Sequence, residues 1–127
     1  MALICKQLLK LRVLRLRSTR VTDVGMACLS TLLHLNDLDV GLCMGISDAS
    51  MSVIGCSDGR LWERLCLRGL PRLTDKGVFR LAGLSVNFLD VSGCVGLTMK
   101  GVNFCRDLAQ LCVCCSALLC LVRQPPT

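Results

Sequence analysis

The sequence predicts an α/β fold of about four to five repeated units, each consisting of a strand, a loop and a short helix. Aliphatic pairs recur at spacings of 24, 27 and 24 residues, at Leu14-x-Leu16, Leu38-x-Val40, Leu65-x-Leu67 and Leu89-x-Val91. Each pair is followed five or six residues later by an aliphatic residue and a hydroxyl residue. Because 53% of the residues are hydrophobic and only 3% aromatic, the shared core of the stacked units must be aliphatic.

The first element expected is a helix over residues 1–10, because "MALICKQLLKL" echoes "MACLSTLLHL" at 26–35. The predicted organisation is therefore a partial preceding repeat over 1–10, repeats over 11–105, and a degenerate terminal repeat with a Cys-rich apolar tail over 106–127. An array that begins inside a unit lacks a polar capping unit. We therefore interpret the chain as a fragment, a truncated isoform or a divergent gene product that self-associates through its uncapped ends.

Strands are expected where apolar and polar residues alternate, as in "LRVLRLR" at 11–17 and "LNDLDVG" at 35–41. A period of two is typical of a strand with one buried face. The third unit is longer because of a polar insertion at 56–60, placed in the return from helix to strand. A fifth strand is expected in "LAQLCVCC" at 108–115, with Leu111 and Val113 in the buried positions.

Each strand is expected to lead through a loop to a helix. The hydroxyls of Thr22, Ser47, Thr74 and Thr98 are placed to cap the helices, and Asp23, Asp48 and Asp75 put carboxylates in the first turns, whereas Met99 replaces the acid in the fourth unit. Each helix should then bury two residues three positions apart: Met26 and Leu29, Met51 and Ile54, Val78 and Leu81, Val102 and Cys105.

The order Leu-x-x-Leu-x-Leu, two residues, Cys or Asn, and then Ile-Thr-Asp-x-Gly-Leu resembles the cysteine-containing class of leucine-rich repeats. The resemblance covers residues 11–105, and the positions that carry it are Leu35, Leu38, Val40, Cys43, Ile46, Ser47, Asp48, Leu89, Val91, Cys94, Leu97, Thr98 and Gly101, with Gly25 and Gly77 in the other units. It implies a right-handed solenoid with parallel strands on the concave face and short helices on the convex face.

That class occurs chiefly in F-box proteins, so the resemblance implies substrate recognition, by the inner face, for an SCF-type (cullin) E3 ubiquitin ligase. Nothing in the chain resembles the F-box helices that hold the ligase adaptor, so a link to the adaptor would be indirect. Two alternatives stay open: a leucine-rich repeat scaffold or regulatory binding protein outside the ligase, and a truncated isoform that acts as a decoy.

Outward residues of successive strands should form columns, because neighbouring strands lie ~4.8 Å apart. The first column is Val13, Asp37, Arg64, Phe88; the second is Arg15, Asp39, Cys66, Asp90; and the third is Arg17, Gly41, Arg68, Ser92. Arg15 with Asp39 and Asp37 with Arg64 are expected to form ion pairs. The predicted partner-binding residues are Arg15, Arg17, Asp37, Asp39, Arg64, Arg68, Phe88 and Asp90, and an exposed arginine beside an aromatic side chain suits a protein-binding hot spot.

The formal net charge of +6 requires polyanion binding to be considered, since the first 20 residues contain six basic residues and no acid. Nucleic acid is nevertheless disfavoured as a partner, because no aromatic residues interleave the arginines and no recognition helix is visible. A membrane is disfavoured too, since the longest uncharged apolar run, 108–122, is 15 residues long and a spanning helix needs ~20.

No enzyme activity, cofactor or metal site is expected. His34 is the only histidine and falls in a helix-to-strand return, a position that favours a loop or packing role over a catalytic dyad. Cys112-x-x-Cys115 has the spacing of half a zinc site, but a structural site needs a second pair of ligands at a defined distance.

The odd number of cysteines, 11, and the lack of a signal peptide favour reduced thiols and a cytoplasmic or nuclear location. Cys43 and Cys94 lie two units apart, ~10 Å, beyond disulfide reach. Cys66 is expected on the concave face and is therefore the candidate for oxidation. The tail after residue 105 is an imperfect terminal unit, a palmitoylated membrane contact or an altered, self-associating end.

Overall fold

The computed structural model describes residues 1–56 and 60–114 and has an α/β fold with one sheet of five parallel strands. The strands follow one another across the sheet in chain order. They are β1 (Val13–Arg15), β2 (Asp37–Asp39), β3 (Leu61–Cys66), β4 (Ser85–Asp90) and β5 (Ala109–Val113). The predicted α/β class with parallel strands and short helices is confirmed.

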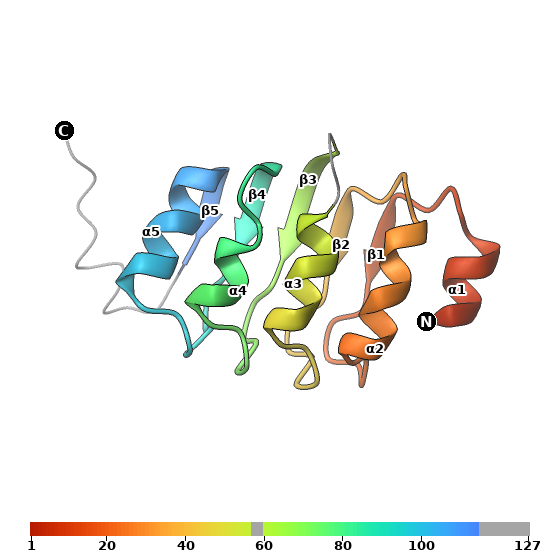
Figure 1. The fold of residues 1–127 in the computed structure, drawn as a ribbon, viewed down its shortest axis with the longest axis horizontal. Helices are drawn as coiled ribbons and strands as arrows, with labels where there is room; N and C mark the ends of the chain where they lie inside the picture. Colours follow the sequence, from red (N-terminus) through yellow and green to blue (C-terminus); the bar gives the residue numbers. More distant parts are fainter. Residues whose placement is uncertain (57–59, 115–127) are drawn as a thin grey trace.

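The helices form a second layer along one face of the sheet (Figure 1). They are α1 (Ala2–Gln7), α2 (Asp23–Met26), the 3-10 helix η1 (Ala27–Thr31), α3 (Asp48–Gly55), α4 (Asp75–Phe79) and α5 (Met99–Leu108). We call the opposite side of the sheet the open face, because no helix of the described residues covers it. Within those residues, no helix combines the length and apolar character needed to cross a membrane.

The core lies between the two layers and is mainly aliphatic, as predicted, with the indole of Trp62 buried in it at 1% exposure. Leu14 pairs with Leu38, Leu38 with Leu65, and Leu65 with Leu89, which is the register that the spacing of the aliphatic pairs predicts. The helix residues predicted to be buried all lie inside, with exposed fractions of at most 3%: Met26, Leu29, Met51, Ile54, Val78, Leu81, Val102 and Cys105.

The fifth strand forms where it was expected, but the prediction of its buried residues is wrong. Leu111 pairs with Phe88 on the open face and is 58% exposed, and Val113 pairs with Asp90. Helix α5 continues to Leu108, and the strand begins at the next residue, so Cys112 rather than Leu111 comes to lie beside Leu89. A shift of one residue exchanges the two faces of a strand. This shift could not be recognised in the sequence, because "LCV" resembles the aliphatic pairs of the other strands.

The prediction for the helix-capping hydroxyls is also corrected. Thr22, Ser47, Thr74 and Thr98 do precede the helices. Of these, only the Ser47 hydroxyl accepts a bond from its own helix, from the Ala49 N–H at 3.4 Å. The hydroxyls of Thr74 and Thr98 donate instead to a carboxylate of the preceding helix, which is a strong acceptor because it is ionised.

Three aspartates join each helix to the start of the next, and we call these contacts the aspartate bridges. In each bridge a hydroxyl donates to one carboxylate oxygen and the backbone N–H of the same residue donates to the other: Ser47 to Asp23 (2.6 and 2.9 Å), Thr74 to Asp48 (2.5 and 2.8 Å), and Thr98 to Asp75 (N–H at 2.9 Å). Met99 stands where a fourth aspartate would be.

A small residue three positions after the hydroxyl residue leaves room for each bridge. A Cβ atom on Gly77 would collide with the Asp48 carboxylate, and one on Gly101 with the Asp75 carboxylate. In the bridge from Asp23, Ser50 holds this position and its hydroxyl donates a further hydrogen bond of 2.5 Å to that carboxylate. The spacing of aspartate and glycine therefore has a packing cause, since the carboxylate occupies the space of the missing side chain.

The turns after the strands contain a left-handed residue at corresponding places, Ser18, Leu42, Gly69 and Gly93, with φ between 60° and 70°. Glycine adopts this conformation without the steric cost that Ser18 and Leu42 bear. Cys43 and Cys94 come directly after two of these left-handed residues. The Cys43 thiol donates to the carbonyl of Leu16 and the Cys94 thiol to the carbonyl of Leu67, each in the adjacent turn and each at 3.0 Å. Both are free thiols, as predicted.

The helix predicted at the amino terminus is present as α1, which packs beside η1 through the buried Cys5. At the other end, α5 runs through the boundary predicted at 105/106. The polar insertion at 56–60 and the Cys-rich tail extend over residues 57–59 and 115–127, so these predictions fall largely outside the described residues.

Candidate functional site

The eight predicted partner-binding residues lie along the open face in the expected columns. The first column is Val13, Asp37, Arg64, Phe88 and Leu111, and the second is Arg15, Asp39, Cys66, Asp90 and Val113. Ladder hydrogen bonds continue past the strand ends from Ser18 to Gly41, from Leu42 to Arg68 and from Gly69 to Ser92. The sheet therefore sets the third column, Arg17, Gly41, Arg68 and Ser92, beside the other two.

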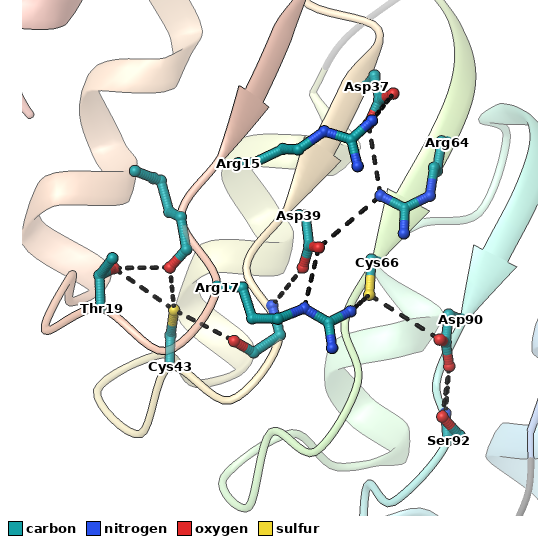
Figure 2. A network of polar contacts seen from close by, with 12 residues as sticks. Arg15, Arg17, Thr19, Asp37, Asp39, Cys43, Arg64, Cys66, Asp90 and Ser92 are labelled. Carbon is teal, nitrogen blue, oxygen red and sulfur yellow. Dashed lines mark hydrogen bonds and ion pairs between the residues drawn. The ribbon is translucent and has the colours of Figure 1, made fainter.

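Asp37 is the centre of one group of ion pairs (Figure 2). Arg15 Nη2 lies 3.3 Å from Asp37 Oδ2, and Arg64 Nη1 lies 3.7 Å from Asp37 Oδ1 and 3.8 Å from Asp39 Oδ2. The predicted pair of Asp37 with Arg64 is present. Arg15, however, pairs diagonally with Asp37 and not with Asp39 directly opposite, because Arg17 occupies the Asp39 carboxylate.

Asp39 is the buried link between three strands. Its carboxylate accepts the Gly41 N–H at 2.9 Å and Arg17 Nε at 3.1 Å, and its exposed fraction is 4%. Arg17 continues across Gly41 to Cys66, whose sulfur lies 3.3 Å from Arg17 Nη2. Burial alone would raise the pKa of Asp39, but the hydrogen bonds from Gly41 and Arg17 outweigh it and lower the pKa. The same pairing raises the pKa of Arg17.

Asp90 has a structural role of the same kind. Its Oδ1 accepts the Ser92 N–H at 2.9 Å and the Ser92 hydroxyl at 2.6 Å. The two aspartates thus each bind the N–H two residues later, which fixes the turn where the chain leaves the sheet. Asp39 and Asp90 form the floor of the open face, and any part they have in partner binding is to hold the side chains above them.

The predicted exposure of Cys66 is wrong. The thiol lies in the second column as expected, but its exposed fraction is 0% because the Arg17 guanidinium crosses over it. Burial also raises the pKa of the Cys66 thiol, so little of the reactive thiolate exists near neutral pH. The alternation of residues along β3 could not reveal the burial of Cys66, because this burial depends on how far Arg17 extends across the sheet from two strands away.

The groups that remain accessible on the open face are arginines and apolar side chains. The Arg15 side chain is 57% exposed and the Arg17 side chain 39%. Arg68 is exposed and, within the described part of the chain, its side chain makes no hydrogen bond or ion pair. Arg64 lies over the Phe88 ring at 5.8 Å, and Leu111 is the next residue of that column. Sequence reasoning missed Leu111 because it assigned that residue to the core.

The described residues of the open face do not include a histidine. His34 is exposed in the return to β2 and does not belong to any of the three columns. In residues 1–56 and 60–114 no three His, Cys, Asp or Glu side chains are grouped so that they could hold a metal ion. What this surface offers chemically is charge, hydrogen-bond donors and apolar area.

Comparison of the chain with models of known protein families and with curated proteins finds no match to either.

Proposed function

We propose that this protein is a protein-recognition module that binds its partner through the open face of its sheet. The observation that carries the proposal is that exposed arginines share with Phe88 and Leu111 a surface that no described helix covers. Arginine and aromatic side chains are enriched among residues that dominate binding energy at protein interfaces. The role needs no catalytic residue and no cofactor.

The finer architecture that we propose is a right-handed leucine-rich repeat solenoid of the cysteine-containing class, with the open face as its concave side. Support comes from strands in chain order, from aliphatic pairs in register, and from Cys43 and Cys94 bound to carbonyls of the adjacent turns. The aspartate bridges supply a reason for the aspartate and glycine of that motif.

Within this architecture, the proposed setting is substrate recognition for an SCF-type cullin ubiquitin ligase, in the cytoplasm or nucleus. It rests on the motif resemblance, and the free thiols of Cys43, Cys66 and Cys94 are compatible with a reducing compartment. A scaffold outside the ligase is the alternative. A decoy that binds substrate without the adaptor is a further form of the same recognition role.

The test is quantitative affinity purification of the tagged chain from proteasome-inhibited cells, with the wild type compared with Arg68→Ala, Phe88→Ala and the control Lys100→Ala, which lies on α5. A partner on the open face should be lost from both open-face variants and retained by the control. Co-purified cullin adaptor and ubiquitin conjugates would support the ligase setting, and a partner without adaptor would support the scaffold or decoy. Equal recovery from all four chains would contradict the proposed surface.

A further inference from the structure

The open face separates its charges by depth. The carboxylates lie deep, since the side chains of Asp37 and Asp39 are 16% and 6% exposed and Asp90 is buried. The exposed groups above them are guanidinium groups: the Arg15 and Arg17 side chains are 57% and 39% exposed. A partner that approaches this face therefore meets positive charge first, although the face contains acids and bases in nearly equal number.

The arginines also have hydrogen-bonding capacity to spare. A guanidinium group has five N–H donors, whereas Arg15 uses one contact to Asp37, and Arg17 two, to Asp39 and Cys66. Arg64 Nη1 is buried beside its two aspartates without a hydrogen-bond partner, so only the exposed remainder of that side chain, 29%, is open to a ligand. Groups of this kind bind a carboxylate through two parallel N–H donors.

An apolar strip adjoins the arginines. Phe88 is half-buried against the Arg64 guanidinium, and Leu111 beside it is 58% exposed. A cation held over an aromatic ring keeps its outer N–H groups available to a ligand. The face thus combines a carboxylate-binding part and a part that can cover an aliphatic or aromatic side chain.

We infer that the segment recognised by the open face is an acidic peptide in which Asp or Glu residues flank an aliphatic or aromatic anchor. This inference rests on the proposed function and specifies its partner. The carboxylates contact Arg15, Arg17, Arg64 and Arg68, and the anchor packs on Phe88 and Leu111. Nucleic acid fits less well, because Phe88 is the only aromatic residue in the three columns and stacking platforms need several.

The test begins with a random dodecapeptide library displayed on phage and selected against the purified full chain. Selected peptides are then synthesised, and their affinities are measured by fluorescence anisotropy for the wild type, for Arg15→Gln/Arg68→Gln, for Lys76→Gln/Lys100→Gln and for Phe88→Ala. The two double variants lose the same charge, but the lysines lie on helices α4 and α5. Urea unfolding verifies that all four proteins are folded.

We expect the selected peptides to be rich in Asp and Glu around one apolar residue. The arginine variant should bind them at least ~10-fold more weakly, the lysine variant should differ by less than ~2-fold, and raised salt should weaken binding because exposed charges are screened. Replacement of Glu by Gln in the peptide should remove the difference between the proteins.

Three outcomes would overturn the inference, and they separate it from the proposed function. Selected peptides without an acidic excess that still require Phe88 would leave the recognition role standing and reject the acidic partner. Peptides that bind Phe88→Ala and the arginine variant with the same affinity as the wild type would reject both the acidic partner and the proposed recognition surface. Binding of a single-stranded oligothymidylate as tightly as the best peptide, lost in the arginine variant, would replace the peptide with a polyanion.

Discussion

At the scale of the residue, Asp39 shows how a side chain that looks like a surface ligand can be a structural part. It points outward from a strand, in a column that also contains an arginine. Its carboxylate is nevertheless buried and accepts hydrogen bonds from the Gly41 N–H and from Arg17. Removal of a buried acceptor leaves its donors without partners, which costs more than the bond itself contributed. The charge of Asp39 is therefore needed for folding before it can matter for binding.

We predict that Asp39→Ala lowers the free energy of unfolding by ~2–3 kcal/mol, and that Asp39→Asn lowers it less, because the amide oxygen can still accept the Gly41 N–H. Urea unfolding at neutral pH measures both. Asp107→Ala on α5 is the matched control, since that acid is exposed and a surface change costs ~0.5 kcal/mol or less. A loss for Asp39→Ala no larger than the control would contradict the assignment.

The cysteines should differ in reactivity according to their burial. Cys56 is exposed, whereas Cys66 is fully buried and burial raises its pKa. Treatment of the native chain with iodoacetamide near neutral pH should therefore label Cys56 first and leave Cys66 protected until denaturant is added. Mass spectrometry of the digested protein reads out each site, and similar labelling rates at the two cysteines would show that Arg17 does not cover the Cys66 thiol.

At the scale of the element, the helices are held to one another by polar contacts as well as by the aliphatic core. Each aspartate bridge joins the first turn of one helix to the residue that begins the next, 23 to 26 residues later. The glycine in the following helix is part of the contact. Glycine has a low helix propensity, but it is favoured at this position because the carboxylate from the neighbouring helix needs the space.

Gly77→Ala tests this contact. In an ordinary helix interior, alanine stabilises relative to glycine by ~0.5–1 kcal/mol, but here the new Cβ would collide with Asp48, so we expect a loss of stability in urea unfolding. Gly25→Ala is the control, because a Cβ atom at that position would lie 3.1 Å from its nearest neighbours, which are apolar side-chain atoms and not a carboxylate. In an Asp48→Ala background, Gly77→Ala should cost much less, and an equal cost in both backgrounds would reject the bridge as the cause.

The strands allow the core to be separated from the binding surface. Leu38→Ala and Leu65→Ala should each cost ~2–5 kcal/mol of stability, since both side chains are completely buried in adjacent strands. Arg68→Ala should change stability by ~0.5 kcal/mol or less while weakening the bound partner. Thermal unfolding together with the binding assay compares the three, and a similar loss of stability in all of them would mean that the open face has been misassigned.

At the scale of the whole molecule, the acids with lowered pKa lie on both layers. Burial would raise the pKa of Asp23, but the hydrogen bonds from Ser47 and Ser50 outweigh it and lower the pKa, as those from Gly41 and Arg17 do for Asp39. A depressed pKa means that the folded chain binds protons less readily than the unfolded chain. The resulting stability is complete above the unfolded pKa of ~3.9 and is lost as the pH falls through the lower folded values.

Urea midpoints measured from neutral pH down to strongly acidic pH should therefore be constant at first and then fall below about pH 4. Asp23→Asn should reduce the size of this fall, because one of the two groups no longer titrates. A wild-type midpoint that stays constant down to the lowest pH would contradict the link between these two carboxylates and folding.

Much of the fold could be predicted because the periodicity and spacing of hydrophobic residues can be identified directly in the sequence. The pairing of Leu14, Leu38, Leu65 and Leu89 and the buried helix residues follow from them. The columns of the candidate surface could be predicted for the same reason, although a role in binding stays a prediction. The β5 register could not, since it depends on where α5 ends and not on the strand sequence.

For β1, β2, β4 and the helices, the sequence by itself determined which of the predicted residues face the core and which face outward, because alternation and helical spacing decide the side of each element. Only the tertiary structure decided what the outward residues do. Asp39 and Asp90 are buried although they point away from the core. Arg17 covers Cys66, and the hydroxyls of Ser47, Thr74 and Thr98 donate to the preceding aspartates. These contacts join residues more than twenty positions apart, so they depend on how neighbouring elements stack and how far long side chains extend.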